Sequence, residues 1–262
     1  MLSIITPLHQ EPYLKQTIDS LLDNAEGDIE VIPVFDGAVL TEPLRDDPRL
    51  KPIFIEHRGM RGAINAGVSI AKGEFIMRSD EHCMFGPGFD KILTESCQPN
   101  WIMTATRYFL DPILWERMDM EPVNFEKLEK LVIQENKKFA GQRWTSSDIE
   151  RKDVMIDETM AMQGSMWMMK KTWWDKVIGE LQTEGYGPLI QDSHEMVFKT
   201  WKAGGKLMLN KNTWFAHKHR DFPRSHNNGT VENPAHCDDG YAYALSVWKD
   251  YYEKEIVPKW RI

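Results

Sequence analysis

The sequence has few cysteines and no long apolar segment. Only three of its 262 residues are cysteines (Cys83, Cys97 and Cys237), an odd number without the paired spacing of a disulfide framework or a zinc ribbon. No apolar run approaches the roughly 20 residues needed to span a bilayer. The N-terminus enters the strand-like "LSIIT" at once, without a basic leader. We therefore expect a soluble, cytoplasmic protein with no transmembrane segment.

Positive charge is also scarce. Lys and Arg total 32 against 40 Asp and Glu, which gives a net charge of -8. Because nucleic-acid binding depends on Lys and Arg that neutralise phosphates, a surface built mainly for nucleic acid is not indicated, although a local basic groove stays open. The sequence contains no internal repeat and is long enough for one domain with a sizeable core.

Strand-like and helix-like segments alternate over the first hundred residues. The apolar runs are "LSIIT", "IEVIPVF", "KPIFIE" and "EFIM", and the helical patterns are "PYLKQTIDSLLDN" and "RGAINAGVSIAKG". This alternation predicts an α/β fold with a mostly parallel central sheet flanked by helices. Ligands of such sheets collect at the carboxyl ends of the strands. Polar and turn residues follow the four predicted strands, namely Thr6, Pro7, Glu11, Asp36, Gly37, Arg58, Arg61 and Asp80. Each could also be a plain turn residue.

The second half is less regular. We expect strands in "WIMTATRYF" and "ETMAMQGSMWMMKK", an amphipathic helix in "VNFEKLEKLVIQENKKFAG", a polar loop in "QRWTSSDIERKD" and a helix in "DSHEMVFKTWKAGG". Residues 221–240 are rich in Pro, Gly, Asn and Asp, which predicts an irregular segment, and the chain closes with an aromatic helix that packs on the same domain.

The segment "RSDEHCMF" places Asp80 and His82 two residues apart after a predicted strand. In an extended segment these side chains face the same side. A carboxylate with an imidazole suits a divalent ion such as manganese, and two protein ligands leave room for substrate oxygens. The alternative is that Asp80 caps a turn and His82 is a surface histidine. Spacing alone leaves both interpretations open.

The opening "SIITPLHQEPYLKQTIDSLL" resembles the first strand and helix of family 2 glycosyltransferases, which have the GT-A fold. The stretch "INAGVSIAKGEFIMRSDEH" resembles their Arg-Asn-x-Gly helix, with Asn65 as its asparagine, leading into a strand and the metal motif. Here the usual Asp-x-Asp motif is Asp-x-His. That variant is similar to the polypeptide N-acetylgalactosaminyltransferases of family 27, in which Asp, His and a later His hold manganese.

Later segments extend the resemblance to about residue 220. "LIQDSHEMVFKTWKAGGKLMLNKNTWFAHKHR" resembles the family 27 segment that ends in His-x-x-Arg, which matches His217 and Arg220. "TMAMQGSMWMMKKTWW" resembles the acceptor-side strand of that family and places Gly164 at the site. The resemblance implies a catalytic domain over residues 1–220, with a nucleotide-sugar half over 1–100 and an acceptor half over 101–220.

The resemblance implies a metal-dependent glycosyltransferase that moves a sugar, hexosyl or N-acetylhexosaminyl, from a nucleotide-diphosphate donor such as a UDP-sugar to an acceptor hydroxyl. Asp80, His82 and His217 would hold Mn²⁺ or Mg²⁺. The other residues expected at the donor are Pro7, Glu11, Asp36, Arg58, Arg61, Asn65, Gly164 and Arg220. The acceptor stays open between a glycan, a protein, a lipid carrier, a small metabolite and a modified nucleic-acid base.

Asp192 is the expected general base if the reaction inverts the anomeric centre. In a retaining enzyme it would instead orient a substrate, and it could also be the N-cap of the helix that it opens.

Two functions of other classes stay open. A nucleotidyltransferase would be expected to show an early Gly-rich phosphate loop, which "TPLHQEPY" lacks, and a catalytically silent sugar- or nucleotide-binding module would not need an intact metal site.

Overall fold

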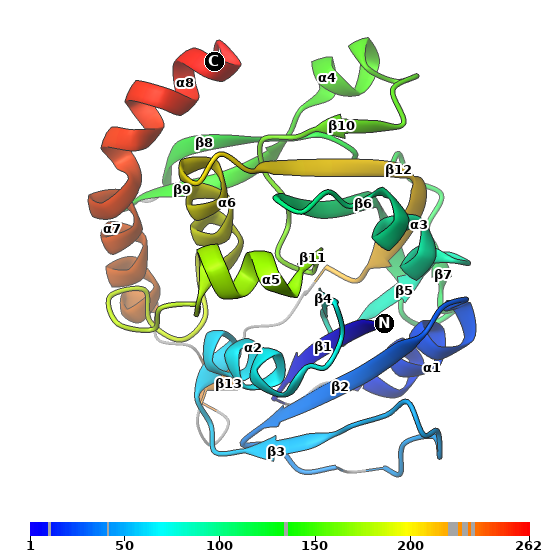
Figure 1. The fold of residues 1–262 in the computed structure, drawn as a ribbon. Coiled ribbons are helices and arrows are strands. Elements are labelled where there is room, and N and C mark those ends of the chain that lie inside the picture. The colour runs from blue at the N-terminus through cyan, green and yellow to red at the C-terminus, as the bar shows by residue number, and fades with distance from the viewer. Residues whose placement is uncertain (10–11, 41, 134–135, 220–224, 227–229, 232–233) are drawn as a thin grey trace.

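The computed structural model describes residues 1–9, 12–40, 42–133, 136–219, 225–226, 230–231 and 234–262. Its main sheet follows the order β10-β12-β6-β11-β4-β1-β2-β3, with β5 paired to β12 and β7 to β6 (Figure 1). The strands are β1 (Leu2–Leu8), β2 (Ile29–Asp36), β3 (Ile53–Ile55), β4 (Phe75–Ser79), β5 (Cys83–Phe85), β6 (Trp101–Asp111), β7 (Glu116–Arg117), β10 (Ile156–Glu158), β11 (Met166–Lys170) and β12 (Lys206–His217).

Helices pack on the sheet, and the chain ends with helices α7 and α8 (Figure 1). They are α1 (Leu14–Asn24), α2 (Gly59–Ile70), α3 (Phe89–Ser96), α4 (Thr145–Glu150), α5 (Lys171–Trp173), α6 (Asp192–Lys202), α7 (Pro234–Tyr251) and α8 (Val257–Trp260), with π-helical turns at Trp174–Ile178 and Tyr252–Ile256. Two hairpins form two-stranded sheets that are separate from the main sheet. One pairs β8 (Glu126–Ile133) with β9 (Asn136–Arg143), and the other pairs β13 (Ser225–His226) with β14 (Thr230–Val231).

The first four strands are parallel to one another, and β11 runs antiparallel between β4 and β6. Successive residues of β1 face opposite sides of the sheet. Leu2 and Ile4 belong to the cluster under α1, while Ile5 belongs to the cluster under α2. A Cβ on Gly67 of α2 would lie 2.5 Å from the Cγ2 of Ile5, so glycine lets this helix approach the strand. The α/β fold predicted from the alternation is confirmed.

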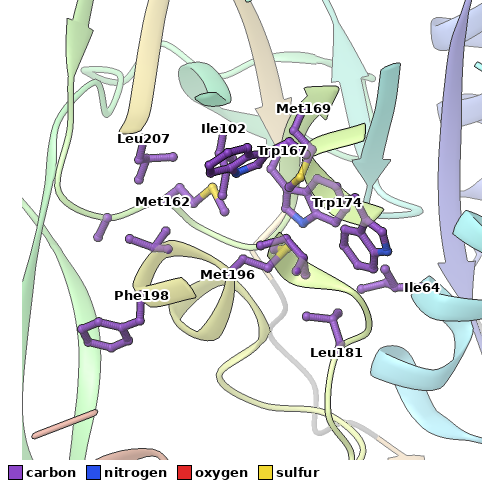
Figure 2. Packing of buried hydrophobic residues seen from close by; sticks show 14 of the residues in the cluster. Ile64, Ile102, Met162, Trp167, Met169, Trp174, Leu181, Met196, Phe198 and Leu207 are labelled. Carbon is purple, nitrogen blue, oxygen red and sulfur yellow. The ribbon is translucent and has the colours of Figure 1, made fainter. Parts of the chain in front are cut away.

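The second hydrophobic cluster joins the sheet to the C-terminal helices. Figure 2 shows Trp167 of β11 beside Trp174, and their rings stack with centroids 5.7 Å apart. Met196 and Phe198 of α6 complete this part of the core, and Phe198 stacks on Trp248 of α7. The aromatic stripe of the last helix therefore packs on the domain, as expected. None of the helices in the described ranges is long and apolar enough to cross a membrane.

The helix predicted over residues 123–141 is wrong, because this segment forms most of the β8–β9 hairpin. Its apolar residues fit both the helical and the strand period, and tertiary packing decides between them. Leu128 and Phe139 are both buried, and Phe139 packs against Phe198 and Tyr252. The Tyr252 hydroxyl also donates to the carbonyl of Leu128 at 2.8 Å.

Two segments expected to be irregular contain helices. The polar stretch after Arg143 includes α4, in which Ser147 is buried and Asp148 accepts a hydrogen bond from the backbone N–H of Phe125. This short helix has no apolar stripe that the sequence could show. Helix α7 begins at Pro234, inside the segment predicted to be irregular, since proline fits the first turn of a helix. Strand β1 also extends through Thr6 and Pro7 to Leu8.

Candidate active site

A carboxylate and two imidazoles meet beyond the carboxyl end of β4. Asp80 and His82 follow that strand directly, and His217 is the last residue of β12. Strand β12 pairs with β5 so that His217 lies opposite Cys83, the residue after His82. The sheet therefore joins two groups that are 135 residues apart in the chain.

The distances within this trio fit a divalent ion. The Nε2 atoms of His82 and His217 lie 3.1 Å apart, and the Oδ2 of Asp80 is 3.4 Å from His217 Nε2 and 3.8 Å from His82 Nε2. With ligands at about 2.1 Å from the ion, neighbouring ligand atoms are separated by roughly 3.0 Å in octahedral and roughly 3.4 Å in tetrahedral geometry. Asp80, His82 and His217 thus form a candidate divalent-metal site. His82 is only 1% exposed, so its interpretation as a surface histidine is wrong.

The charges of this site suit metal binding. Burial lowers the pKa of His217 to about 3, which keeps its imidazole neutral. Burial opposes ionisation of Asp80, but Arg78 and the two histidines outweigh it and hold the pKa of Asp80 well below its usual value. Neutral histidine and ionised aspartate are the protonation states that bind a metal ion.

Arg78, which the sequence analysis missed, ties the metal site to Asp192. Its Nη2 donates to Oδ1 of Asp80, and its Nη1 donates to Oδ2 of Asp192 at 2.6 Å. Burial disfavours its charge, yet Asp80 and Asp192 outweigh burial and raise the pKa of Arg78. The sequence did contain a signal for this role, an arginine inside the apolar run "FIMRS". A charged side chain in a buried strand needs charged partners, so Arg78 could have been predicted to bind nearby carboxylates.

The metal trio opens into a cavity of about 700 Å³. Asp192 and Gly164 also line it, together with Arg78, Arg107, Glu126 and His219 among others. The β8–β9 hairpin adds Gly141, Gln142 and Arg143, so the segment mistaken for a helix builds part of this wall.

Asp192 is not the N-cap of α6, because it is the first helical residue and Gln191 occupies the cap position. Its carboxylate binds Arg78 instead. Gly164 permits this contact, since a Cβ there would lie 3.0 Å from Arg78 Nη1 and 3.1 Å from Asp192 Oδ2.

Asp36 is not at an exposed strand end as expected, because its side chain is buried against the loop before α2. Its Oδ1 accepts a hydrogen bond from the backbone N–H of Arg58 at 2.6 Å, and its Oδ2 accepts one from the backbone N–H of Gly59 at 2.8 Å. The residue is 3% exposed. The strand β2 thereby fixes the loop that leads into α2.

We expect Asp36→Ala to destabilise the protein, because the buried N–H of Gly59 and the partly buried N–H of Arg58 would lose their acceptor. The cost should be about 1–3 kcal/mol. Urea denaturation followed by circular dichroism measures it. Asp36→Asn, which keeps one acceptor oxygen, should fall between the wild type and the alanine variant. Equal midpoints for all three proteins would show that these hydrogen bonds contribute little.

Four other residues expected at the donor do not line the cavity. Arg61 is fully buried and binds Glu195 and the carbonyls of Gln182 and Ile190, so its guanidinium stabilises the core instead of facing phosphate. Asn65 bonds both backbone groups of Leu181. The other two are Pro7, buried in β1, and Arg58, whose side chain is exposed. Glu11 and Arg220 lie outside the described residues.

His219 lies beside the metal trio but outside it. Its Nε2 is 3.0 Å from Nη1 of Arg107, and its ring contacts His217 and Phe109. Arg107 in turn donates to Glu126 at 2.7 Å. The geometry therefore groups His217, and not His219, with Asp80 and His82.

Residues 3–178 match the model of Glycosyl transferase family 2. The chain belongs to this family. The uncharacterized glycosyltransferase EpsJ of Bacillus subtilis (strain 168) is 31% identical over 107 residues, 38% of this chain and 31% of that protein. A putative polypeptide N-acetylgalactosaminyltransferase 13 of Drosophila melanogaster is 25% identical over 232 residues, 79% of this chain and 39% of that protein.

Among solved structures, the fold is similar to that of GalNAc-T7, crystallised with UDP, GalNAc and Mn²⁺. The TM-score is 0.74 at 17% identity, over 98% of this chain and 50% of that one. The GT-A fold expected from the sequence is thereby confirmed. The chain spans less than two fifths of these two curated relatives and half of the solved chain.

Proposed function

We propose that this member of glycosyl transferase family 2 is a metal-dependent glycosyltransferase, which moves a sugar from a nucleotide-diphosphate donor, a UDP-sugar, to an acceptor hydroxyl. The observation that carries the proposal is the Asp80, His82 and His217 trio, with its ligand atoms gathered at the end of β4 and open to the cavity. Family membership and the fold shared with GalNAc-T7, which was solved with UDP and Mn²⁺, support it.

Mn²⁺ is the proposed ion, with Mg²⁺ as the alternative. Two imidazoles with one carboxylate favour manganese over magnesium, because magnesium binds almost only oxygen ligands in proteins. When bound, the ion would neutralise charge on the departing nucleoside diphosphate. Asp80, His82 and His217 would hold the ion, and the cavity that they line would admit the phosphate oxygens of the donor.

Asp192 is the proposed catalytic or substrate-orienting carboxylate. It lines the cavity, and Arg78 binds both its carboxylate and that of the proposed metal ligand Asp80. In an inverting reaction it would accept the proton of the acceptor hydroxyl. In a retaining reaction it would orient a substrate. For the donor, Asp36 would act by fixing the loop before α2, and Gly164 would act by leaving room for the contact between Arg78 and Asp192.

Titration calorimetry with UDP tests the metal assignment. We expect wild-type protein to bind UDP much more tightly with Mn²⁺ than with EDTA, and His82→Ala to lose most of this difference because it removes a ligand. Lys254→Ala, at an exposed lysine outside the cavity, should keep the difference. Equal UDP affinity with and without metal in every protein would contradict the proposed metal site.

Hydrolysis of UDP-sugars with added Mn²⁺ separates an enzyme from a silent binding module. A transferase should release UDP slowly from at least one UDP-sugar, and release should quicken in a suitable acceptor pool. Binding without any turnover would favour the silent module. Formation of pyrophosphate from a nucleoside triphosphate and a sugar phosphate would favour a nucleotidyltransferase.

A further inference from the structure

At the start of α6, in the cavity wall, two buried polar atoms have no hydrogen-bond partner among the described residues. They are the Oε1 of Gln191 and the Nδ1 of His194, both at the start of α6 beside Asp192. Burying a polar atom without a partner costs free energy, so such an atom in a cavity wall indicates a ligand. We propose that Gln191 and His194 bind the hydroxyl groups of a neutral sugar residue in this cavity, an inference that rests on the proposed function.

The orientation of the Gln191 amide is fixed by its other contact. Its Nε2 donates to the carbonyl oxygen of Phe139 in β9 at 3.0 Å, and the pair is buried. A carbonyl can only accept a hydrogen bond, so the nitrogen of the amide must face Phe139. The remaining Oε1 is therefore an acceptor, which a hydroxyl group of a sugar can satisfy.

The backbone of Gln191 gives a second, independent indication. Its φ is +60°, a region that residues other than glycine rarely adopt. Such strain persists where the surrounding structure imposes it, and it is common at binding and catalytic sites. Glycine would suit this backbone better, so the glutamine side chain must supply something that glycine lacks. The bond to Phe139 accounts for its Nε2 but not for its Oε1.

His194 offers a neutral group at the same wall. Burial lowers the pKa of His194 to about 4, so the ring is uncharged near neutral pH. A neutral imidazole nitrogen either accepts a hydrogen bond from a hydroxyl or donates one to it, according to its tautomer. Both alternatives suit a sugar.

The charges around the cavity point to an uncharged ligand. Each arginine in the described wall is already paired with a carboxylate: Arg78 with Asp80 and Asp192, Arg107 with Glu126, and Arg143 with Asp148. No lysine from the described ranges lines the cavity. The metal trio can take the phosphates of the donor, but the rest of this wall offers no further cation for a second anion. The hydroxyls of a neutral hexose or N-acetylhexosamine match the two open hydrogen-bonding atoms.

Gln191→Met and His194→Leu test the proposal, because each keeps the approximate size of the side chain and removes the hydrogen bond. Calorimetry with Mn²⁺ compares UDP with UDP-glucose, UDP-galactose, UDP-GlcNAc and UDP-GalNAc. Acceptor use is measured as transfer to methyl glycosides of the same sugars. Gln182→Met is the control, since Gln182 is exposed and bonds Tyr243 and Glu184 outside the cavity.

We expect both variants to bind UDP like the wild type and to lose about 3- to 10-fold in one sugar-dependent step, as the loss of one hydrogen bond predicts. A loss in UDP-sugar affinity identifies the transferred sugar as the ligand, and a rise in KM for the methyl glycoside identifies the acceptor sugar.

Variants that match the wild type in both steps would overturn the sugar subsite and leave the proposed function standing. A wild-type protein that binds UDP with Mn²⁺ but gains no affinity from any of the four sugars, and transfers to none of the glycosides, would also overturn the subsite. If the wild type binds neither UDP nor UDP-sugars with Mn²⁺, the proposed function and the subsite both fail.

Discussion

His217→Ala is expected to reduce sugar transfer nearly to background, whereas His219→Ala should retain measurable activity. His217 supplies one of the three atoms gathered for the ion, with its Nε2 3.1 Å from that of His82. His219 instead contacts Arg107 and touches the ring of His217. Losing an outer partner of a metal ligand typically costs roughly 10- to 100-fold in affinity or activity, and losing a ligand should cost more.

The measurement is the initial rate of Mn²⁺-dependent UDP release from the preferred UDP-sugar, with metal concentration varied for each protein. For His219→Ala, higher Mn²⁺ should restore part of the rate, because all three ligands remain. For His217→Ala it should restore little. The reverse order of activities, or a metal complex with His219 coordinated to the ion, would show that the ligand is His219.

Arg78→Met is expected to cause a large loss of stability that Mn²⁺ partly reverses. The variant leaves the carboxylates of Asp80 and Asp192 without the cation that joins them. Removing one partner of a buried ion pair typically costs about 3–5 kcal/mol. A bound divalent ion would compensate Asp80 but not Asp192, so only part of the loss should return.

Urea denaturation with EDTA and with Mn²⁺ measures this effect. Arg78→Lys should fall between methionine and wild type, because one ammonium group cannot reproduce the guanidinium fork that binds two carboxylates. Arg45→Met is the matched control, since this exposed arginine pairs with Asp23 at the surface and its loss should barely move the midpoint. A midpoint for Arg78→Met that equals the control would show that Arg78 does not hold the two carboxylates together.

Local patterns were sufficient for the fold up to β4, whereas the short strand β5 and helix α3 that follow were not predicted. Strands β1, β2, β3 and β4 and helices α1 and α2 all occur where the apolar periodicity predicts them. Asp80 and His82 follow β4, and His217, which the resemblance selects as their partner, lies beside them in the structure. These predictions succeed because a parallel strand between two helices has a clear apolar signal, and because Asp-x-His is a local feature.

Tertiary contacts decided what the local patterns could not. The segment with β8 and β9 has apolar spacing that fits a helix or a strand, and packing against Tyr252 and Phe198 selects the hairpin. Asp36 follows an apolar strand as expected, but its carboxylate turns inward to two backbone N–H groups that no sequence pattern reveals.

The sequence by itself determined the α/β alternation and the residue types of the metal site. Only the tertiary structure decided which side chains face the cavity and which support the core. Arg61 was expected at the phosphates and is buried against Glu195, whereas Arg78 was overlooked and joins Asp80 to Asp192. The physical reason is that a charged side chain takes its role from the partners that folding brings within hydrogen-bonding distance. Here Glu195 lies 134 residues from Arg61, and Asp192 lies 114 residues from Arg78.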